Sequence, residues 1–291
     1  MGNRTLKPNE ILESSVDLAE SKAAGSFVKI AILGFLGGAF IAFAAEGSNM
    51  AAFNLLVSPS AYGLGRALAG MVFAVGLMLV ILCGGELFTG NILMIGGVLR
   101  RRIRLRAMLL NWLVVYVTNF IGAAFIAWMI SRSGLLHSGA DLLGGVTVKI
   151  AAGKTGLPFL SAFLMGIMCN WLVCLAVWLG LGADSMAGKV LGIFFPIWLF
   201  VISGFEHSIA NMYYIPAGIM AKGNSSFVSA ALEAGASMDA IGALNWGNFL
   251  WVNLVPVTIG NIVGGAVFVS MAYLLAYRRD GITGAKRADK G

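Results

Sequence analysis

Long apolar segments separated by short polar ones run along most of the chain. A helix needs about 20 apolar residues to cross the hydrocarbon core of a bilayer, so each segment is long enough to span a membrane. The pattern therefore predicts an all-α membrane protein with six transmembrane helices. The six segments are Phe27–Ala45, Ala67–Leu99, Ala107–Ile130, Pro158–Leu181, Val190–Met220 and Trp246–Tyr277.

The second and fifth segments are too long for one straight helix, and each has polar residues at its centre. These centres read Gly84-x-Glu86-x4-Asn91 and Gly204-x-Glu206-x4-Asn211. Irregular backbone at membrane depth is tolerated only where it is buried in protein or lines a cavity. A carboxylate among glycines therefore predicts that the second and fifth helices are broken, each unwinding and restarting within the membrane.

The two halves of the chain repeat each other. The two broken centres match, and so do the third and sixth segments, which read Asn111-x7-Asn119-x2-Gly122 and Asn253-x7-Asn261-x2-Gly264. Three spans are an odd number, so the second copy has the opposite orientation in the membrane. The sequence predicts a 3+3 inverted repeat, and paired broken helices in such a repeat point to a solute site near the midplane.

Composition and charge agree with a membrane protein and set its orientation. Only 11% of the residues are charged and 59% are hydrophobic, whereas soluble domains carry about a quarter charged residues. Of the 20 Lys and Arg residues, five fall on one side of the predicted spans and 15 on the other. The positive-inside rule then places both termini in the cytoplasm, in the cell's inner (plasma) membrane. It also accounts for the net charge of +7 without a nucleic-acid partner.

Three regions follow from these boundaries. Residues 1–26 mix acidic and basic side chains and are expected to form a cytoplasmic amphipathic segment. Residues 27–277 form the transmembrane channel domain, and residues 278–291 form a basic cytoplasmic tail.

His207 is the strongest candidate for chemistry, because it is one of two histidines and lies at the second break. An ionisable group inside a membrane is a functional candidate by default, and imidazole titrates near neutral pH. The alternative is a structural histidine that bonds a backbone carbonyl. Asn91, Asn211, Asn170 and Thr89 lie in or beside the transmembrane segments and either join helices or orient a polar solute.

Glu86 and Glu206 occupy equivalent positions in the repeat, which favours a structural role over a role in the solute path, where a carboxylate would repel an anion. Each carboxylate could cap backbone N–H groups that the break leaves unpaired. Two lysines precede the fourth span: Lys149 is interpreted as solvated, whereas Lys154 lies near enough to the external mouth to attract an anion.

Signatures of enzymes and bound groups are missing from the sequence. It contains no Gly-x-Ser-x-Gly and no His-Glu-x-x-His, and two histidines are too few for a haem-bearing bundle. We therefore expect no catalytic residues, no metal and no cofactor.

Four stretches resemble the formate/nitrite transporter family, and the resemblance extends over roughly Phe27 to Tyr277. It implies an aquaporin-like fold and a homopentamer in which each protomer has its own pore for small monovalent anions. Pro196, Pro216 and Pro256 resemble formate channels, whereas Glu86–Gly90 and the sequence from Cys169 resemble nitrite members. The four stretches are Gly84–Asn91, Asn170–Ala176, Ser203–Asn211 and Pro256–Asn261.

The resemblance also implies roles for individual residues. The family's central histidine corresponds to His207, its companion polar residues to Asn211 and Thr89, and its vestibule lysine to Lys154. Its apolar constrictions correspond to Phe73, Leu77, Leu87 and Phe200.

Together these observations predict a passive or proton-coupled channel for a small monovalent anion, with formate favoured and nitrite or hydrosulfide as alternatives. In the favoured mechanism Lys154 attracts the anion and His207 supplies a proton, because a neutral acid crosses an apolar constriction far more readily than an anion. The rival is an anion channel in which His207 only donates a hydrogen bond. A reading from another class is a membrane scaffold whose N-terminal helix docks a cytosolic enzyme. The partners expected are the anion, a proton, membrane lipid and further copies of the chain.

Overall fold

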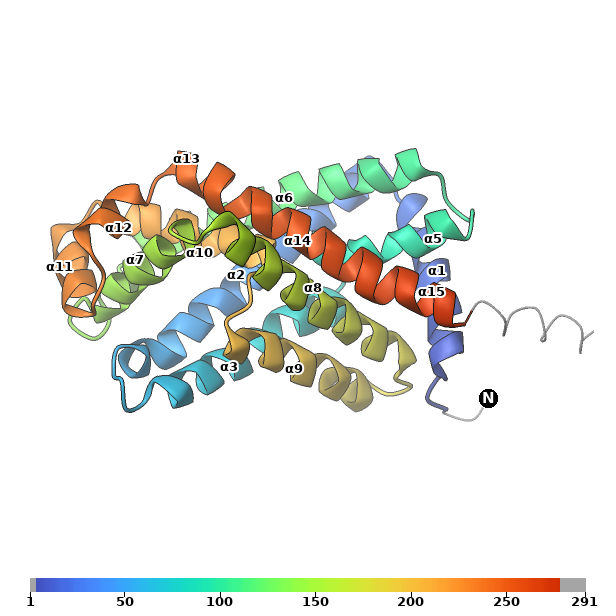
Figure 1. Cartoon of the computed structure of the whole chain (residues 1–291), viewed down its shortest axis with the longest axis horizontal. Coiled ribbons are helices and arrows are strands. Elements are labelled where there is room, and N and C mark those ends of the chain that lie inside the picture. Colours follow the sequence, from blue (N-terminus) through green and yellow to red (C-terminus); the bar gives the residue numbers. More distant parts are fainter. Residues whose placement is uncertain (1–3, 278–291) are drawn as a thin grey trace, which may run out of the picture.

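The computed structural model describes residues 4–277, and within that range the regular structure is entirely helical. Six helices are long and apolar enough to cross a membrane, as the sequence predicts (Figure 1). The sixth is continuous from Trp246 to Ala276 and includes α13 (Trp246–Asn248), α14 (Val255–Gly265) and α15 (Ala272–Ala276). The other five are α2 (Phe27–Leu56), α3 (Tyr62–Cys83), α6 (Leu105–Arg132), α8 (Phe159–Gly182) and α9 (Met186–Ser203).

Both predicted breaks are present. After α3 the chain turns at Gly84 and restarts as a half-helix over Phe88–Leu99, which comprises α4 (Phe88–Asn91), a 3-10 turn and α5 (Ile95–Leu99). After α9 it turns at Gly204 and restarts as α10 (Ser208–Ala221). The φ angles of Gly84 and Gly204 are +88° and +80°, in the left-handed region that glycine adopts without steric cost.

The inverted repeat determines how the spans pack. In the first half α2 packs against α3 and α6, and in the second half α8 packs against α9 and α14. Equivalent glycines permit the close crossings: a Cβ on Gly122 would collide with the carbonyl oxygen of Phe35, and one on Gly264 with that of Ile167. Small residues at such crossings are typical of membrane helices, since their packing depends on close approach of the backbones.

Each half also begins with a shorter helix, which extends the repeat beyond the predicted three spans. The first is α1 (Pro8–Ala23), an amphipathic helix that buries Ile11, Leu12, Val16 and Ala19. The second is α7 (Leu142–Thr155), which lies between the third and fourth predicted spans, where no helix was predicted. The glycines and alanines of α7 give no clear helical periodicity, and its helix is stabilised by packing against α10 and α11 (Ser225–Glu233).

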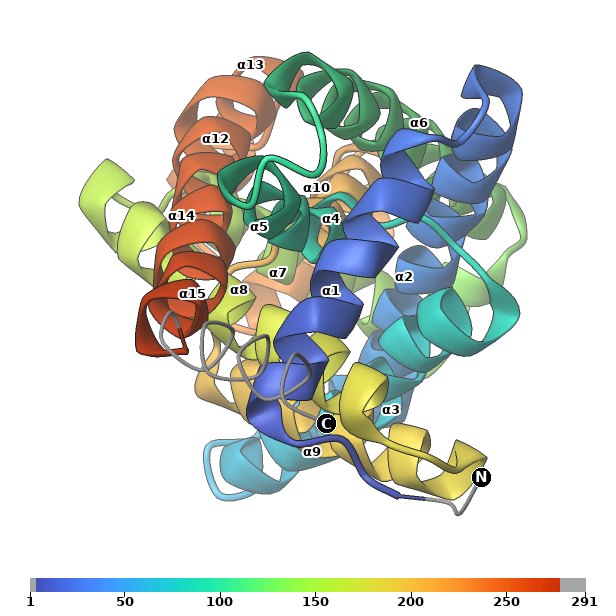
Figure 2. The ribbon, with the colours of Figure 1, turned by 90° about the vertical axis from the view of Figure 1, so that its right-hand side faces the viewer.

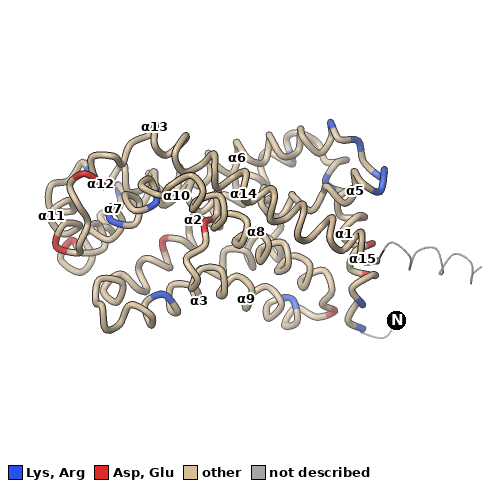
Figure 3. The backbone as a smooth tube through the Cα atoms, viewed as in Figure 1, with Lys and Arg blue, Asp and Glu red and all other residues tan. Residues whose placement is uncertain are grey.

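The ends of the molecule differ in charge. The densest basic group lies in the loop between α5 and α6, at the end where α1 is located (Figure 3). Figure 2 looks onto this end and shows α1 lying across the bundle. The opposite end is formed by α7, α11 and α12 (Met238–Ala243) (Figure 1). The expected basic tail, 278–291, lies outside the described residues.

Candidate functional site

Two asparagines hold the breaks in place. Asn119 Oδ1 accepts the N–H of Phe88 at 3.0 Å, and its Nδ2 donates to the carbonyl oxygens of Gly34 and Glu86 at 2.7 and 2.8 Å. Asn261 makes the same three bonds in the second half, to Ser208, Gly166 and Glu206, at 2.9, 2.8 and 3.0 Å. Each amide therefore satisfies polar backbone groups that the break exposes, as buried backbone requires.

The carboxylates of Glu86 and Glu206 bond side chains, so the expectation that they cap backbone N–H groups is wrong. Glu86 Oε2 accepts from Asn91 Nδ2 at 2.6 Å and from Lys22 Nζ at 2.7 Å. Asn119 and Asn261 bond the first backbone donor of each restarted helix, and the His207 ring bonds the N–H of Ala210 in the second. The carboxylates instead bind an amide and an ammonium group, which compensates a charge that would otherwise be costly to bury.

The second break has the same arrangement. Glu206 Oε2 accepts from Asn211 Nδ2 at 2.7 Å, and Glu206 Oε1 accepts from Lys154 Nζ at 2.6 Å. Lys154 is therefore not a free ammonium group at the mouth but one half of an ion pair. Asn253 completes the cluster through bonds from its own Nδ2 to the Lys154 carbonyl and from Asn211 to its Oδ1.

Lys22 is a site residue that the sequence reasoning missed. It ends α1 as Lys154 ends α7, and each lysine pairs with the carboxylate at the nearer break. The signal was present: Lys22 and Lys154 are 132 residues apart, the same spacing as Gly34 and Gly166. The prediction of a separate cytoplasmic segment over residues 1–26 conceals this pairing.

His207 lies where the two half-helices meet, and 2% of its surface is exposed. Its Nδ1 accepts the N–H of Ala210 at 3.0 Å, which makes His207 the N-cap of α10. Its Nε2 lies 3.0 Å from Thr89 Oγ1, on the other half-helix. Since Nδ1 accepts a hydrogen bond, a neutral ring carries its proton on Nε2 and donates it towards Thr89.

Asn170 supports this contact from α8. Its Nδ2 donates to the carbonyl oxygens of Thr89 and Asn261 at 3.2 and 2.8 Å. The Oδ1 atoms of Asn170 and Asn211 are buried and have no hydrogen-bond partner in the described part of the chain. Asn170 therefore joins the two breaks, and Asn211 keeps one buried acceptor without a partner in the described residues.

The four predicted constriction residues form two pairs, one at each of two cavities. Phe73 and Phe200 contact edge to face at a centroid distance of 5.7 Å and line a cavity of about 330 Å³ together with His207. Leu77 and Leu87 line a second cavity of about 410 Å³ on the side of α1. All four side chains are apolar and almost fully buried, which suits the barrier between the two cavities that the sequence predicts.

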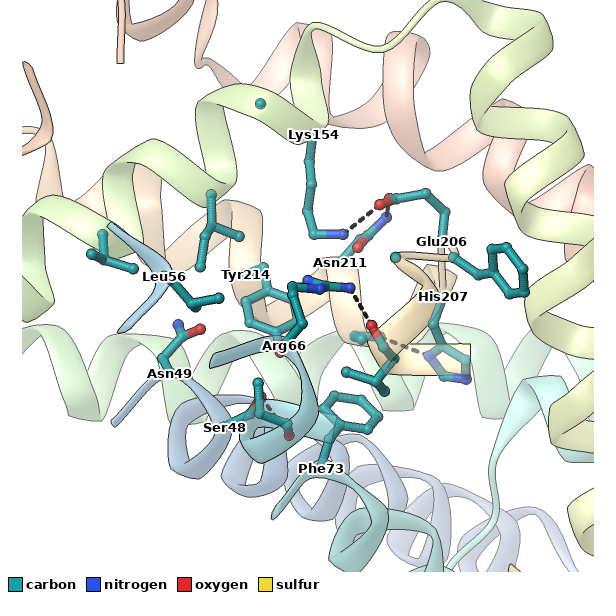
Figure 4. A pocket seen from close by; sticks show the side chains of 18 of the residues that line it. Ser48, Asn49, Leu56, Arg66, Phe73, Lys154, Glu206, His207, Asn211 and Tyr214 are labelled. Atoms are coloured by element: carbon teal, nitrogen blue, oxygen red, sulfur yellow. Dashed lines mark hydrogen bonds and ion pairs between the residues drawn. The ribbon is translucent and has the colours of Figure 1, made fainter. Parts of the chain in front are cut away.

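Both cavities are cationic. The first, which we term the external cavity, is lined by Arg66, Lys149, Lys154 and Glu206, a formal charge of +2 from three cations and one carboxylate. Figure 4 shows Arg66, Lys154 and Glu206. The second, the internal cavity, has the same balance from Lys22, Lys29, Lys189 and Glu86. Lys149 is not simply solvated as expected, because its Nζ donates to the Ala234 carbonyl at 2.5 Å. Among residues 4–277 no group of His, Cys, Asp or Glu is arranged to hold a metal ion.

Polar residues in the outer half of α2 were also missed. The first apolar segment was expected to end at Ala45, but α2 continues to Leu56 and buries Glu46, Ser48 and Asn49. Glu46 accepts a hydrogen bond from the buried Tyr213 hydroxyl, and Asn49 lines the external cavity. The polar side chains of Glu46, Ser48 and Asn49 predicted the end of a span. In the structure these residues are buried, because α2 packs against α3 and α10.

The fold and the site define a class: membrane proteins built as an inverted repeat, with two half-helices that meet between two solvent-facing cavities, as in channels and transporters. Comparison with known proteins identifies the group within that class. The sequence profile of the family described as "Formate/nitrite transporter" matches residues 9–275. The chain therefore belongs to the formate/nitrite transporter family.

Individual relatives agree with this assignment. The chain is 40% identical to the protein named "Formate channel BtFdhC" of Bacillus thuringiensis, over 94% of this chain and 96% of that protein. It is 37% identical to the "Probable formate transporter" of Methanothermobacter thermautotrophicus, over 96% of this chain and 100% of that protein. A solved structure titled "Pentameric formate channel with formate bound" matches with a TM-score of 0.75 at 36% identity, covering 86% of this chain and 97% of that chain.

Proposed function

We propose that the protein is a channel for small monovalent anions and that formate is its principal cargo. One observation carries the proposal: a buried His207–Thr89 contact joins two half-helices between two cationic cavities, and apolar side chains separate those cavities. Cationic mouths attract anions, and the N-terminal ends of half-helices favour negative charge. Formate is supported over nitrite and hydrosulfide by the printed names of relatives 36–40% identical to this chain.

The protonation of His207 distinguishes the two transport mechanisms. A protonated ring would turn Nδ1 into a donor facing the N–H of Ala210, which donates to it at 3.0 Å. The observed bond thus favours the neutral ring, whose Nε2–H can donate to an anion that displaces the Thr89 hydroxyl. This supports the hydrogen-bond-donor mechanism over the one in which His207 supplies a proton.

Assembly and orientation complete the proposal. We expect a homopentamer, because the solved relative is titled as pentameric and shares the fold. Native mass spectrometry of the detergent-solubilised protein should show five chains, and a particle of one or two chains only would refute the pentamer. The basic loop between α5 and α6 supports an orientation in the cell's inner membrane with the α1 end and both termini in the cytoplasm.

The proposal is tested by stopped-flow light scattering of proteoliposomes challenged with the potassium salt of formate, nitrite or hydrosulfide in the presence of valinomycin, which reports anion entry whether or not a proton moves with it. We expect protein-dependent flux that is largest for formate. Larger nitrite or hydrosulfide flux at equal driving force would reassign the cargo, and flux equal to that of protein-free liposomes for all three anions would refute the channel.

A further inference from the structure

We propose that Arg66, assisted by Asn49, captures the anion in the external cavity, and that its guanidinium selects anions with two oxygen atoms. The inference rests on the proposed function and adds the residues that choose the cargo before it reaches His207. Figure 4 shows both side chains beside the cavity, with Arg66 near the Lys154–Glu206 pair.

The two lysines of this cavity are already engaged. Lys154 Nζ lies 2.6 Å from Glu206 Oε1, so the pair contributes no net charge to an approaching anion. Lys149 Nζ donates to the carbonyl oxygen of Ala234, away from the barrier. The positive charge that remains uncompensated near the barrier is that of Arg66.

Most N–H groups of the Arg66 guanidinium bond no acceptor in the described residues. One of its terminal nitrogens donates to the carbonyl oxygen of Val201, and no carboxylate of residues 4–277 lies within ion-pair distance of it. A guanidinium carries five N–H groups, so most remain available to a ligand. Val201 follows Phe200, a barrier residue, so this bond holds the charge at the entrance to the apolar constriction.

Asn49 gives an independent sign of a ligand. Its side chain is 2% exposed, lines the same cavity and has an Nδ2 with no hydrogen-bond partner in the described structure. A buried donor without a partner is costly, and an oxyanion in the cavity would satisfy it. A cation and a buried amide whose donor has no partner in the described residues thus line one cavity.

The guanidinium determines which anions fit. Its planar fork donates two parallel N–H bonds to a pair of oxygens, as in a carboxylate, whereas an ammonium acts as a point charge. Formate and nitrite present two oxygens, and hydrosulfide presents a single sulfur. Arg66 therefore favours the first two over the third at the external mouth.

The test measures half-saturating concentrations for formate and hydrosulfide applied to the external side of oriented proteoliposomes, using wild type, Arg66→Lys and Lys149→Gln. Arg66→Lys keeps the charge and loses the fork, so we expect the formate value to rise about tenfold while the hydrosulfide value changes less than about twofold. Lys149→Gln is the matched control, since it removes a cation from the same cavity, and should leave the formate-to-hydrosulfide ratio unchanged.

Asn49→Leu provides a second arm if Arg66→Lys fails to assemble. Leucine is close in size and removes a donor that has no protein partner, so folding should be kept. We expect a higher half-saturating formate concentration with unchanged maximal flux. Wild-type selectivity in Arg66→Lys, or wild-type formate affinity in a folded Asn49→Leu protein, would overturn the inference. Absence of flux in the wild type would instead refute the proposed function itself.

Discussion

At the scale of single residues, the His207 ring makes two contacts that both depend on its protonation state. Nδ1 caps α10 through the N–H of Ala210, and Nε2 reaches Thr89 on the other half-helix. A proton on Nδ1 would break the cap, which is worth about 1 kcal/mol at an ordinary helix start. The ring thus connects the structure of the break to the contact that an anion would replace.

Replacing His207 with asparagine keeps a side chain that can cap α10 and removes the titratable ring. Asparagine is a favourable N-cap, so His207→Asn should stay folded and oligomeric. Its amide still offers a donor but does not titrate, so we expect formate flux to fall by less than about tenfold with unchanged proton co-movement. The measurement is internal pH and formate uptake in the same proteoliposomes. A folded His207→Asn protein that still takes up formate anion but has lost proton co-movement would instead establish His207 as the proton donor.

Sequence patterns located these residues but not their partners. The motif Gly-x-Glu-x4-Asn identified both breaks, because an internal repeat is visible in one dimension. Which donor each carboxylate meets depends on helices distant in sequence: Lys22 precedes Glu86 by 64 positions, and Lys154 precedes Glu206 by 52. For that reason the capping interpretation of Glu86 and Glu206 was wrong and Lys22 was missed.

At the scale of elements, α1 is attached by both an apolar face and ion pairs. Its apolar side chains pack against α8 and the first half-helix, while Arg102 in the α5–α6 loop bonds Glu20 at 2.5 and 2.7 Å. This hydrogen bond lowers the pKa of the Glu20 carboxyl from its ordinary value of 4.5, and the charge of Arg102 adds to the effect. Both side chains are exposed, so the ion pair contributes little to the free energy of docking α1. The buried apolar face contributes most of it.

The lowered pKa of Glu20 sets the sign of a pH dependence. A carboxyl group whose pKa is lower in the docked state stabilises docking above its ordinary value, 4.5, and loses that contribution as the pH falls through the lowered value. Hydrogen-exchange protection of the α1 amides, corrected for intrinsic rates, should therefore be constant between about pH 6 and 8 and decrease below 4.5. Arg102→Gln is the control and should reduce the size of this decrease; an equal decrease in Arg102→Gln would assign the pH effect to other groups.

At the scale of the whole molecule, the repeat makes the two faces chemically alike. Each face has a cavity with a formal charge of +2, a lysine–carboxylate pair and two of the predicted constriction residues. The six spans and their inversion could be predicted from the sequence, since length and motif spacing determine them. The equivalence of α1 and α7 could not, because α7 is recognisable as a helix only from its packing.

The orientation of the repeat gives a labelling prediction. Single cysteines at Ser138, just before α7, and at Ser185, just before α9, should face opposite sides of the membrane, outside and inside respectively. The background should carry Cys83→Ser, because Cys83 is exposed whereas Cys169 and Cys174 are buried. Labelling of both positions from one side by a membrane-impermeant thiol reagent would contradict the inverted arrangement.

We propose that formate crosses the membrane through the contact between His207 and Thr89. The decisive measurement is uptake of radiolabelled formate into proteoliposomes of wild type and of His207→Phe, with oligomeric state and melting temperature checked for both. We expect saturable, protein-dependent uptake in wild type and a loss of about 10- to 100-fold in His207→Phe, since phenylalanine keeps the aromatic ring and removes the donor. Wild-type uptake no faster than in protein-free liposomes, or full uptake by a folded His207→Phe protein, would contradict the claim.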